Sequence, residues 1–93
     1  MKQSLSKNLA DELNIDYARA VTAVMKAQLV AAVAKAAQKR GLTHEELARR
    51  SGLPRSAVTG ILSGSLQKVT IDRLLRLVEA AGLVAEVKVR NVA

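Results

Sequence analysis

The sequence of 93 residues has no cysteine, one histidine and one proline. Without cysteine the chain can form no disulfide, no thiolate zinc site and no cysteine nucleophile. One histidine alone does not supply a set of metal ligands, and no glycine-rich phosphate loop is present. Few side chains remain for acid–base or nucleophilic catalysis. We therefore expect a protein that is not an enzyme and that uses no metal, no cofactor and no small-molecule ligand.

Aromatic side chains are also nearly missing, since Phe and Trp are absent and Tyr17 is the single aromatic residue. The core must therefore consist of Leu, Val, Ile and Ala. A chain of this size buries only about 60–65% of its unfolded surface, and so thin a core favours an oligomer in which a second copy covers apolar surface. One aromatic residue also disfavours binding of RNA or single-stranded DNA by base stacking.

Long apolar runs are lacking as well. Residues 1–12 are polar and reach Asp11 and Glu12 early, unlike a secretory signal. The most apolar stretch, residues 27–37, is interrupted by Gln28 and Lys35 and is too short to cross a bilayer. The absence of cysteine fits a reducing compartment. We expect a cytoplasmic protein without a membrane partner.

Positive charge is in excess, with a formal net charge of +7. The excess is uneven, because residues 1–25 hold three cations against three carboxylates, and residues 26–93 hold twelve against five. A field of this sign suits an anionic partner such as nucleic acid or an acidic membrane. A solvated surface that keeps the protein soluble explains the charge equally well, so charge alone leaves both readings open.

One long helix is predicted from about Asp16 to Arg40, where glycine and proline are absent. Its apolar positions step by three and four residues, and Val30 and several alanines fall off this stripe, so we expect more than one face to be covered. Gly41 follows the basic pair Lys39-Arg40 and ends the helix. The stripe comprises Tyr17, Val21, Val24, Met25, Gln28, Leu29, Ala32, Val33 and Ala36.

Two short helices follow. Thr43 opens the first, and Glu46 three residues later completes a capping box. Gly52 ends this helix after little more than two turns. Pro54 suits the first position of the second helix, because its ring fixes φ and it has no N–H to leave unpaired. That helix ends at Gly64, and two short helices joined by a glycine turn are the parts of a helix-turn-helix.

The spacing inside this segment has a mechanical meaning. Ala48 is small, so the two helices can cross closely. Four residues later Gly52 permits the backbone conformation of a tight turn. Six residues further on, Val58 packs the second helix against the first. Together with the capping box and Gly64, these residues form a more specific signal than any one of them.

A final helix and a tail complete the chain. After a loop over residues 65–69, Thr70 caps a helix that Gly82 closes. Its apolar face holds Ile71, Leu74, Leu75, Leu77 and Val78. In the tail, Ala85, Val87 and Val89 alternate with charged residues, which predicts a strand. One strand cannot pair its own backbone groups, so we expect it to pair antiparallel with the same strand of a second copy.

The chain resembles the Cro/C1-type (XRE family) helix-turn-helix regulators over about residues 22–82. The resemblance is carried by residues 42–53, LTHEELARRSGL, by the helix that follows them, and by residues 70–77, TIDRLLRL. The tail after Gly82 is similar to that of small phage and plasmid regulators and antitoxins that end in a strand. The resemblance implies a lambda-repressor-like bundle and a DNA-binding dimer whose second motif helix enters the major groove.

Helical geometry selects the residues that face DNA. The apolar side of the second motif helix holds Val58, Ile61 and Leu62, and the opposite side is polar. Arg in the first turn can bind guanine O6 and N7 together. The family usually has a longer polar side chain where Gly60 stands, and close approach of backbone to DNA and a merely tolerated glycine explain it equally well. The predicted base-reading residues are Arg55, Ser56, Thr59 and Gly60.

Phosphate contacts are expected from helix N-termini and the loops beside them. His44 stands where the family commonly has Gln, and Lys68 lies where family members often grip a flanking phosphate. Helix capping alone also explains the threonines. The predicted phosphate-binding residues are Thr43, His44, Ser63, Lys68 and Thr70. A solvated basic face or ion pairs better explain Arg49, Arg50, Arg73 and Arg76.

The predicted fold is therefore an all-α helix-turn-helix bundle of four to five helices with one C-terminal strand. We divide it into an N-terminal arm or helix (residues 1–21), a DNA-binding domain (22–82) and a dimerisation strand (83–93) that pairs through Ala85, Val87 and Val89. The expected function is repression by a homodimer bound to an inverted repeat in double-stranded DNA, at the nucleoid. The alternative is an antitoxin that neutralises a toxin protein with its near-neutral first 25 residues and represses its own operon.

Overall fold

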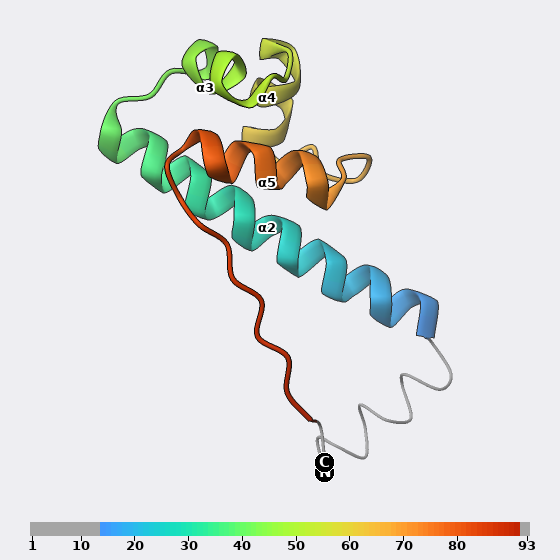
Figure 1. Ribbon diagram of the computed structural model, residues 1–93. Coiled ribbons are helices and arrows are strands. Elements are labelled where there is room, and N and C mark those ends of the chain that lie inside the picture. The colour runs from blue at the N-terminus through green and yellow to red at the C-terminus, as the bar shows by residue number, and fades with distance from the viewer. Residues whose placement is uncertain (1–13, 92–93) are drawn as a thin grey trace.

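Four helices make up the part of the chain that the computed structural model describes, residues 14–91 (Figure 1). Helix α5 packs along α2, α3 packs against both α4 and α5, and α4 also contacts α2. The four helices agree with the predicted helical bundle, whereas the predicted C-terminal strand is not seen among the described residues. Most of the arm or helix expected over residues 1–21 lies outside the described range. The helices are α2 (Asn14–Arg40), α3 (His44–Ser51), α4 (Arg55–Leu62) and α5 (Ile71–Ala80).

The long helix α2 ends as predicted and begins at Asn14 rather than at about Asp16. Gly41 adopts a positive φ of 68° just past its last residue. The N–H of Leu42 then donates to the carbonyl oxygen of Ala37 at 2.8 Å. This is the hydrogen bond of a glycine-ended helix, and it satisfies a carbonyl group that would otherwise lack a partner.

The buried face of α2 differs from the predicted stripe. The core residues of α2 are Val30, Val33 and Ala37, and both Val30 and Ala37 lie off that stripe. The contacts of α2 with the core begin only at Leu29, because its N-terminal half extends beyond the other helices (Figure 1). Four stripe residues in that half are exposed instead, namely Tyr17 (50%), Val21 (39%), Val24 (56%) and Met25 (43%).

The helix ends of the motif follow the predicted signals with two differences. Thr43 caps α3, because its hydroxyl oxygen accepts the N–H of Glu46 at 3.1 Å. The carboxylate of Glu46 lies 3.5 Å from Arg50 instead of closing the second half of the capping box. Pro54 is the N-cap of α4 rather than its first residue, since its ψ of 147° is extended. Gly52 has the positive φ, 78°, that the turn requires.

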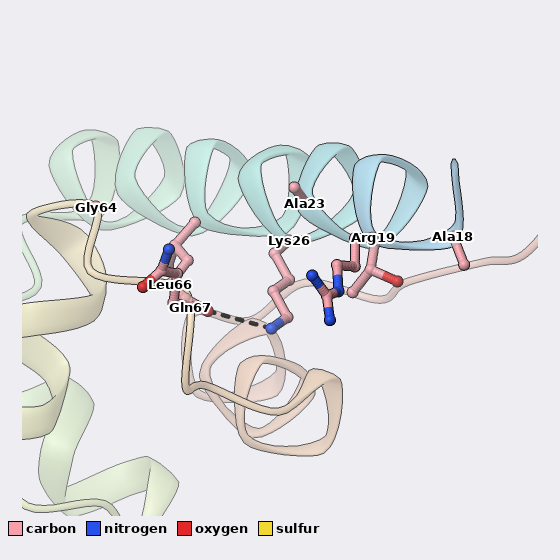
Figure 2. A pocket seen from close by; sticks show the side chains of 8 residues that line it. Ala18, Arg19, Ala23, Lys26, Gly64, Leu66 and Gln67 are labelled. Atoms are coloured by element: carbon pink, nitrogen blue, oxygen red, sulfur yellow. Dashed lines mark hydrogen bonds between the residues drawn. The ribbon is translucent and has the colours of Figure 1, made fainter. Parts of the chain in front are cut away.

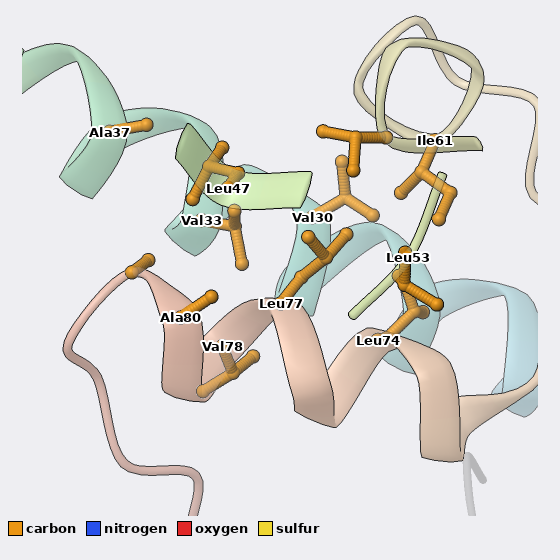
Figure 3. Close-up of a cluster of buried hydrophobic side chains, with 12 residues drawn as sticks. Val30, Val33, Ala37, Leu47, Leu53, Ile61, Leu74, Leu77, Val78 and Ala80 are labelled. Carbon is orange, nitrogen blue, oxygen red and sulfur yellow. The ribbon is translucent and has the colours of Figure 1, made fainter. Parts of the chain in front are cut away.

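The core consists of aliphatic residues, as the composition demands (Figure 3). Leu47, Val58, Leu74 and Leu77 have no exposed surface, and they come from α3, α4 and α5. Full burial of one such side chain stabilises the fold by about 1.5–3 kcal/mol. Leu75 was expected in the apolar face of α5 but is 42% exposed. It follows Leu74 by one residue, and a rotation of about 100° turns it away from the core.

The tail forms no strand within the single chain. Residues 83–91 run as an extended segment away from α5 (Figure 1). Its valines contact little, because Val84, Val87 and Val89 are 88%, 78% and 89% exposed. An extended segment with unpaired backbone groups is available for pairing with another strand.

Helix α2 is long and apolar enough to cross a membrane by length and composition. Its C-terminal half nevertheless builds the core through Val30, Val33 and Ala37. The guanidinium of Arg40 donates to the carbonyl oxygen of Ala81 at 2.9 Å and ties the end of α2 to the end of α5. This half of the helix is thus a structural element of the folded domain, and its composition does not indicate a membrane.

Candidate nucleic-acid interface

Helix α4 has one buried side and one outward side. Val58 and Ile61 are 0% and 2% exposed and fix the helix against the core. Their burial fixes the rotation of the helix, so the side chains on its opposite side point away from the core. Arg55, Ser56 and Thr59 are exposed and Gly60 is half-buried. The four predicted base-reading residues therefore share the outward side of α4.

Gly60 is not required by the fold of the chain itself. Its φ is not positive, and a Cβ atom built on it would meet nothing within 4 Å. A glycine inside a helix costs about 1 kcal/mol relative to alanine. Gly60 therefore lowers the stability of α4 on its outward side, although no contact within the chain requires a residue without a side chain at this position.

A hydrogen bond joins α3 to the outward side of α4. His44 Nδ1 lies 2.9 Å from Thr59 Oγ1. Depending on the tautomer, the ring nitrogen accepts the hydroxyl proton or donates to the oxygen. In both cases Thr59 is held by the first residue of α3. The sequence predicts His44 as a phosphate-binding residue and Thr59 as a base-reading residue. It does not predict their contact, since no local pattern signals a contact across 15 residues.

The remaining predicted phosphate-binding residues lie at helix ends around α4. The hydroxyl oxygen of Thr70 accepts the N–H of Arg73 at 3.2 Å, so both threonines cap helices. The hydroxyl of Ser63 donates to the carbonyl oxygen of Thr59 at 2.7 Å. Lys68 is exposed in the loop before α5. Helix N-termini carry partial positive charge, so the N-terminal ends of α3 and α5, together with Lys68, are places of positive potential.

Several of the other cations have partners within the described residues. Glu46 lies 3.8 Å from Arg49 and 3.5 Å from Arg50, and Asp72 lies 3.8 Å from Arg76. These exposed pairs contribute little stability. The carboxylates partly neutralise the positive charge that these arginines would otherwise offer to a ligand. Arg55 takes part in no ion pair among residues 17–91, and its guanidinium is free for an external acceptor.

One contact near this surface has no signal in the sequence. The ammonium group of Lys26 on α2 donates to the carbonyl oxygen of Leu66 at 3.1 Å. The bond connects residues 40 positions apart and anchors the loop between α4 and α5. Among the described residues, no group of three or more His, Asp or Glu side chains is arranged to hold a metal ion.

The fold and the outward side of α4 define the class of protein. Two short helices crossed around a glycine turn, with a buried side and a polar exposed side, form a helix-turn-helix unit. A family model described as a helix-turn-helix domain matches residues 6–90. The chain therefore belongs to this helix-turn-helix domain family, which indicates a DNA-binding regulator. Searches of curated protein sequences and of solved structures give no match to the chain.

Proposed function

We propose that the protein is a Cro/C1-type transcriptional regulator that binds a specific sequence in double-stranded DNA, at the nucleoid in the cytoplasm. The observation that carries this proposal is the division of α4 into a fully buried side, with Val58 and Ile61, and an exposed side that begins at Arg55. An α-helix presented in this way fits the major groove, where base edges carry a distinct pattern of donors and acceptors.

Each predicted residue has a role in this arrangement. Arg55, in the first turn of α4, binds guanine O6 and N7 with two parallel hydrogen bonds. Ser56 and Thr59 bond to neighbouring base edges, and His44 restricts the Thr59 side chain to one orientation. Gly60 lets the backbone of α4 approach the DNA closely. Phosphate groups on the two sides of the groove are bound by Thr43, His44, Lys68 and Thr70, and by Ser63 when its hydroxyl proton turns from the Thr59 carbonyl oxygen to the phosphate.

The regulator acts as a dimeric repressor in this proposal. In the tail, Val87 and Val89 are 78% and 89% exposed. The extended backbone around them pairs with no strand among the described residues. Antiparallel pairing of residues 83–93 with the same segment of a second copy, through Ala85, Val87 and Val89, pairs these backbone groups and brings side chains of the two strands into contact. A two-fold axis then requires an inverted-repeat operator whose half-sites lie about 34–36 Å apart.

The test compares two exposed cations with different proposed roles. Arg55→Ala should cost about 1–3 kcal/mol on the preferred duplex and relax the preference at one base pair. Lys68→Ala should weaken binding to all duplexes and lower the slope of log K against log salt by about one for each bound protomer. Fluorescence anisotropy over a range of salt concentrations measures both effects. Equal losses for Arg55→Ala on preferred and random duplexes would refute base reading by α4.

An antitoxin is the second candidate, and one observation favours it. Tyr17, Val21, Val24 and Met25 are exposed on the half of α2 that extends beyond the core. This surface exceeds what the helix-turn-helix unit needs and lies in the near-neutral part of the chain. A toxin reading frame next to the gene, and a stable complex of the two proteins, would favour this candidate over a simple repressor.

A further inference from the structure

A cleft lies between the N-terminal half of α2 and the loop that joins α4 to α5 (Figure 2). It encloses about 930 Å³. Arg19, Thr22 and Lys26 line it from α2, and Gly64, Leu66 and Gln67 line it from the loop. The cleft is separate from the outward side of α4, and none of the residues predicted to bind DNA lines it.

The wall that α2 contributes is positively charged. Arg19 and Lys26 lie seven residues apart, which is two helical turns and roughly 10 Å along the axis, and both extend toward the loop (Figure 2). No carboxylate among residues 17–91, whose side chains the structure describes, lines the cleft, and the ion pairs among these residues lie on α3 and α5. Within the described part of the chain, the wall of the cleft therefore carries positive charge only.

Both cations have hydrogen-bond donors left for an anion. Lys26 uses one donor for the carbonyl oxygen of Leu66 at 3.1 Å, and an ammonium group has three. This bond also fixes the position of the charge relative to the loop. Arg19 is exposed, and its guanidinium carries five N–H donors in a planar fork that matches phosphate oxygens.

The position of the cleft indicates which anion it binds. Its loop wall continues directly into Lys68 and Thr70, which the proposed function assigns to DNA phosphates. The cleft is open along α2 and continues the line of residues assigned to phosphates, so a phosphate of the flanking DNA backbone is the anion that its position favours. The cleft thus extends the positive border of the helix-turn-helix unit along α2.

We propose that Arg19 and Lys26 form an additional phosphate-binding site for the DNA backbone that flanks the half-site read by α4. This proposal rests on the proposed function, and it predicts a contact with DNA longer than the helix-turn-helix unit alone makes. Arg19 binds phosphate oxygens through its fork, while Lys26 holds the loop in place and adds a second charge.

The test uses Arg19→Gln with Lys35→Gln as the matched control. Lys35 is also an exposed cation on α2, it does not line the cleft, and its replacement changes the net charge equally. Binding is measured across salt concentrations on a short duplex with the half-sites only and on a duplex with about ten more base pairs on each side. Melting temperatures confirm that both variants are folded.

Arg19→Gln should weaken binding to the long duplex about fivefold to tenfold at 0.1 M salt and lower the salt slope by about 0.9 for each protomer, which is about 1.8 for the dimer. Arg19→Gln should bind the short duplex with the affinity of the original protein. Lys35→Gln should bind both duplexes with that affinity. Equal effects of the two variants on the long duplex, or an equal loss for Arg19→Gln on both duplexes, would refute the flanking site.

The same comparison on random duplexes separates this proposal from sequence reading by α4. Phosphate contacts carry no sequence information, so the length-dependent loss should persist there even if Arg55 reads no base. Inorganic phosphate can be added while the NMR signals of the Leu66 and Gln67 amides are followed. If phosphate shifts these signals in the original protein but not in Arg19→Gln, and Arg19→Gln shows no length-dependent loss on DNA, the cleft binds a small phosphate ligand. That result would overturn the assignment to DNA. If the protein bound no duplex at all, both proposals would be wrong.

Discussion

Replacing Gly60 with alanine should make the protein more stable and a poorer DNA binder. The added methyl group meets nothing within 4 Å, and the φ of Gly60 is not positive. The substitution therefore gains the helix-propensity difference of about 0.5–1 kcal/mol without a steric cost. For a domain of this size, that gain raises the melting temperature by about 2–8 °C. Thermal unfolding followed by circular dichroism measures the shift.

The effect on DNA binding should have the opposite sign. If the backbone of α4 lies close to the DNA at Gly60, a methyl group there is overpacked, which typically costs about 1–3 kcal/mol. That cost corresponds to roughly a 5- to 150-fold weaker complex. Anisotropy titrations of the same sample on the preferred duplex measure it, and the raised melting temperature serves as the control for folding. A more stable variant with unchanged affinity would refute close approach at this position.

Three further predictions concern the core, the motif and the tail. Leu47→Ala removes a side chain with no exposed surface and should cost about 2–5 kcal/mol in urea unfolding; a loss below about 1 kcal/mol would contradict its place in the core. Thr59→Val removes the hydroxyl that His44 holds, and it should weaken binding to the preferred duplex more than to random DNA, whereas uniform weakening would argue against base reading. Deletion of residues 84–93 should yield monomers by light scattering, and a persistent dimer would disprove pairing through the tail.

Local signals predicted the helix ends of the motif well. Thr43 and Gly52 act within a few residues of their own position, through a side-chain cap and a positive φ. Such effects are readable from the sequence, because their partners are fixed by chain proximity. The predicted position of Pro54 in the helix is wrong by one residue: it is the N-cap of α4 and not its first residue. The fixed φ of proline is compatible with both positions. The outward side of α4 followed from the burial of Val58 and Ile61 by the same local geometry.

Features that depend on distant partners could not be predicted. The apolar stripe of α2 contains two overlapping faces, and only the positions of α4 and α5 decide that Val30 is buried while Val24 is exposed. The bond between Lys26 and Leu66 joins residues 40 positions apart. The bond between His44 and Thr59 needs the crossing of α3 and α4. No periodicity or capping rule specifies these contacts, because they arise only when the helices pack.

Selection of bound duplexes from a random pool tests the central claim most directly, because the protein itself picks out its operator from all possible sequences. Reading of base edges by Arg55 and its neighbours predicts enrichment of an inverted repeat whose half-sites lie one helical turn apart, with a guanine in each. The Arg55→Ala protein should lose the preference at that guanine. Recovery of a pool without any enriched sequence would contradict the account.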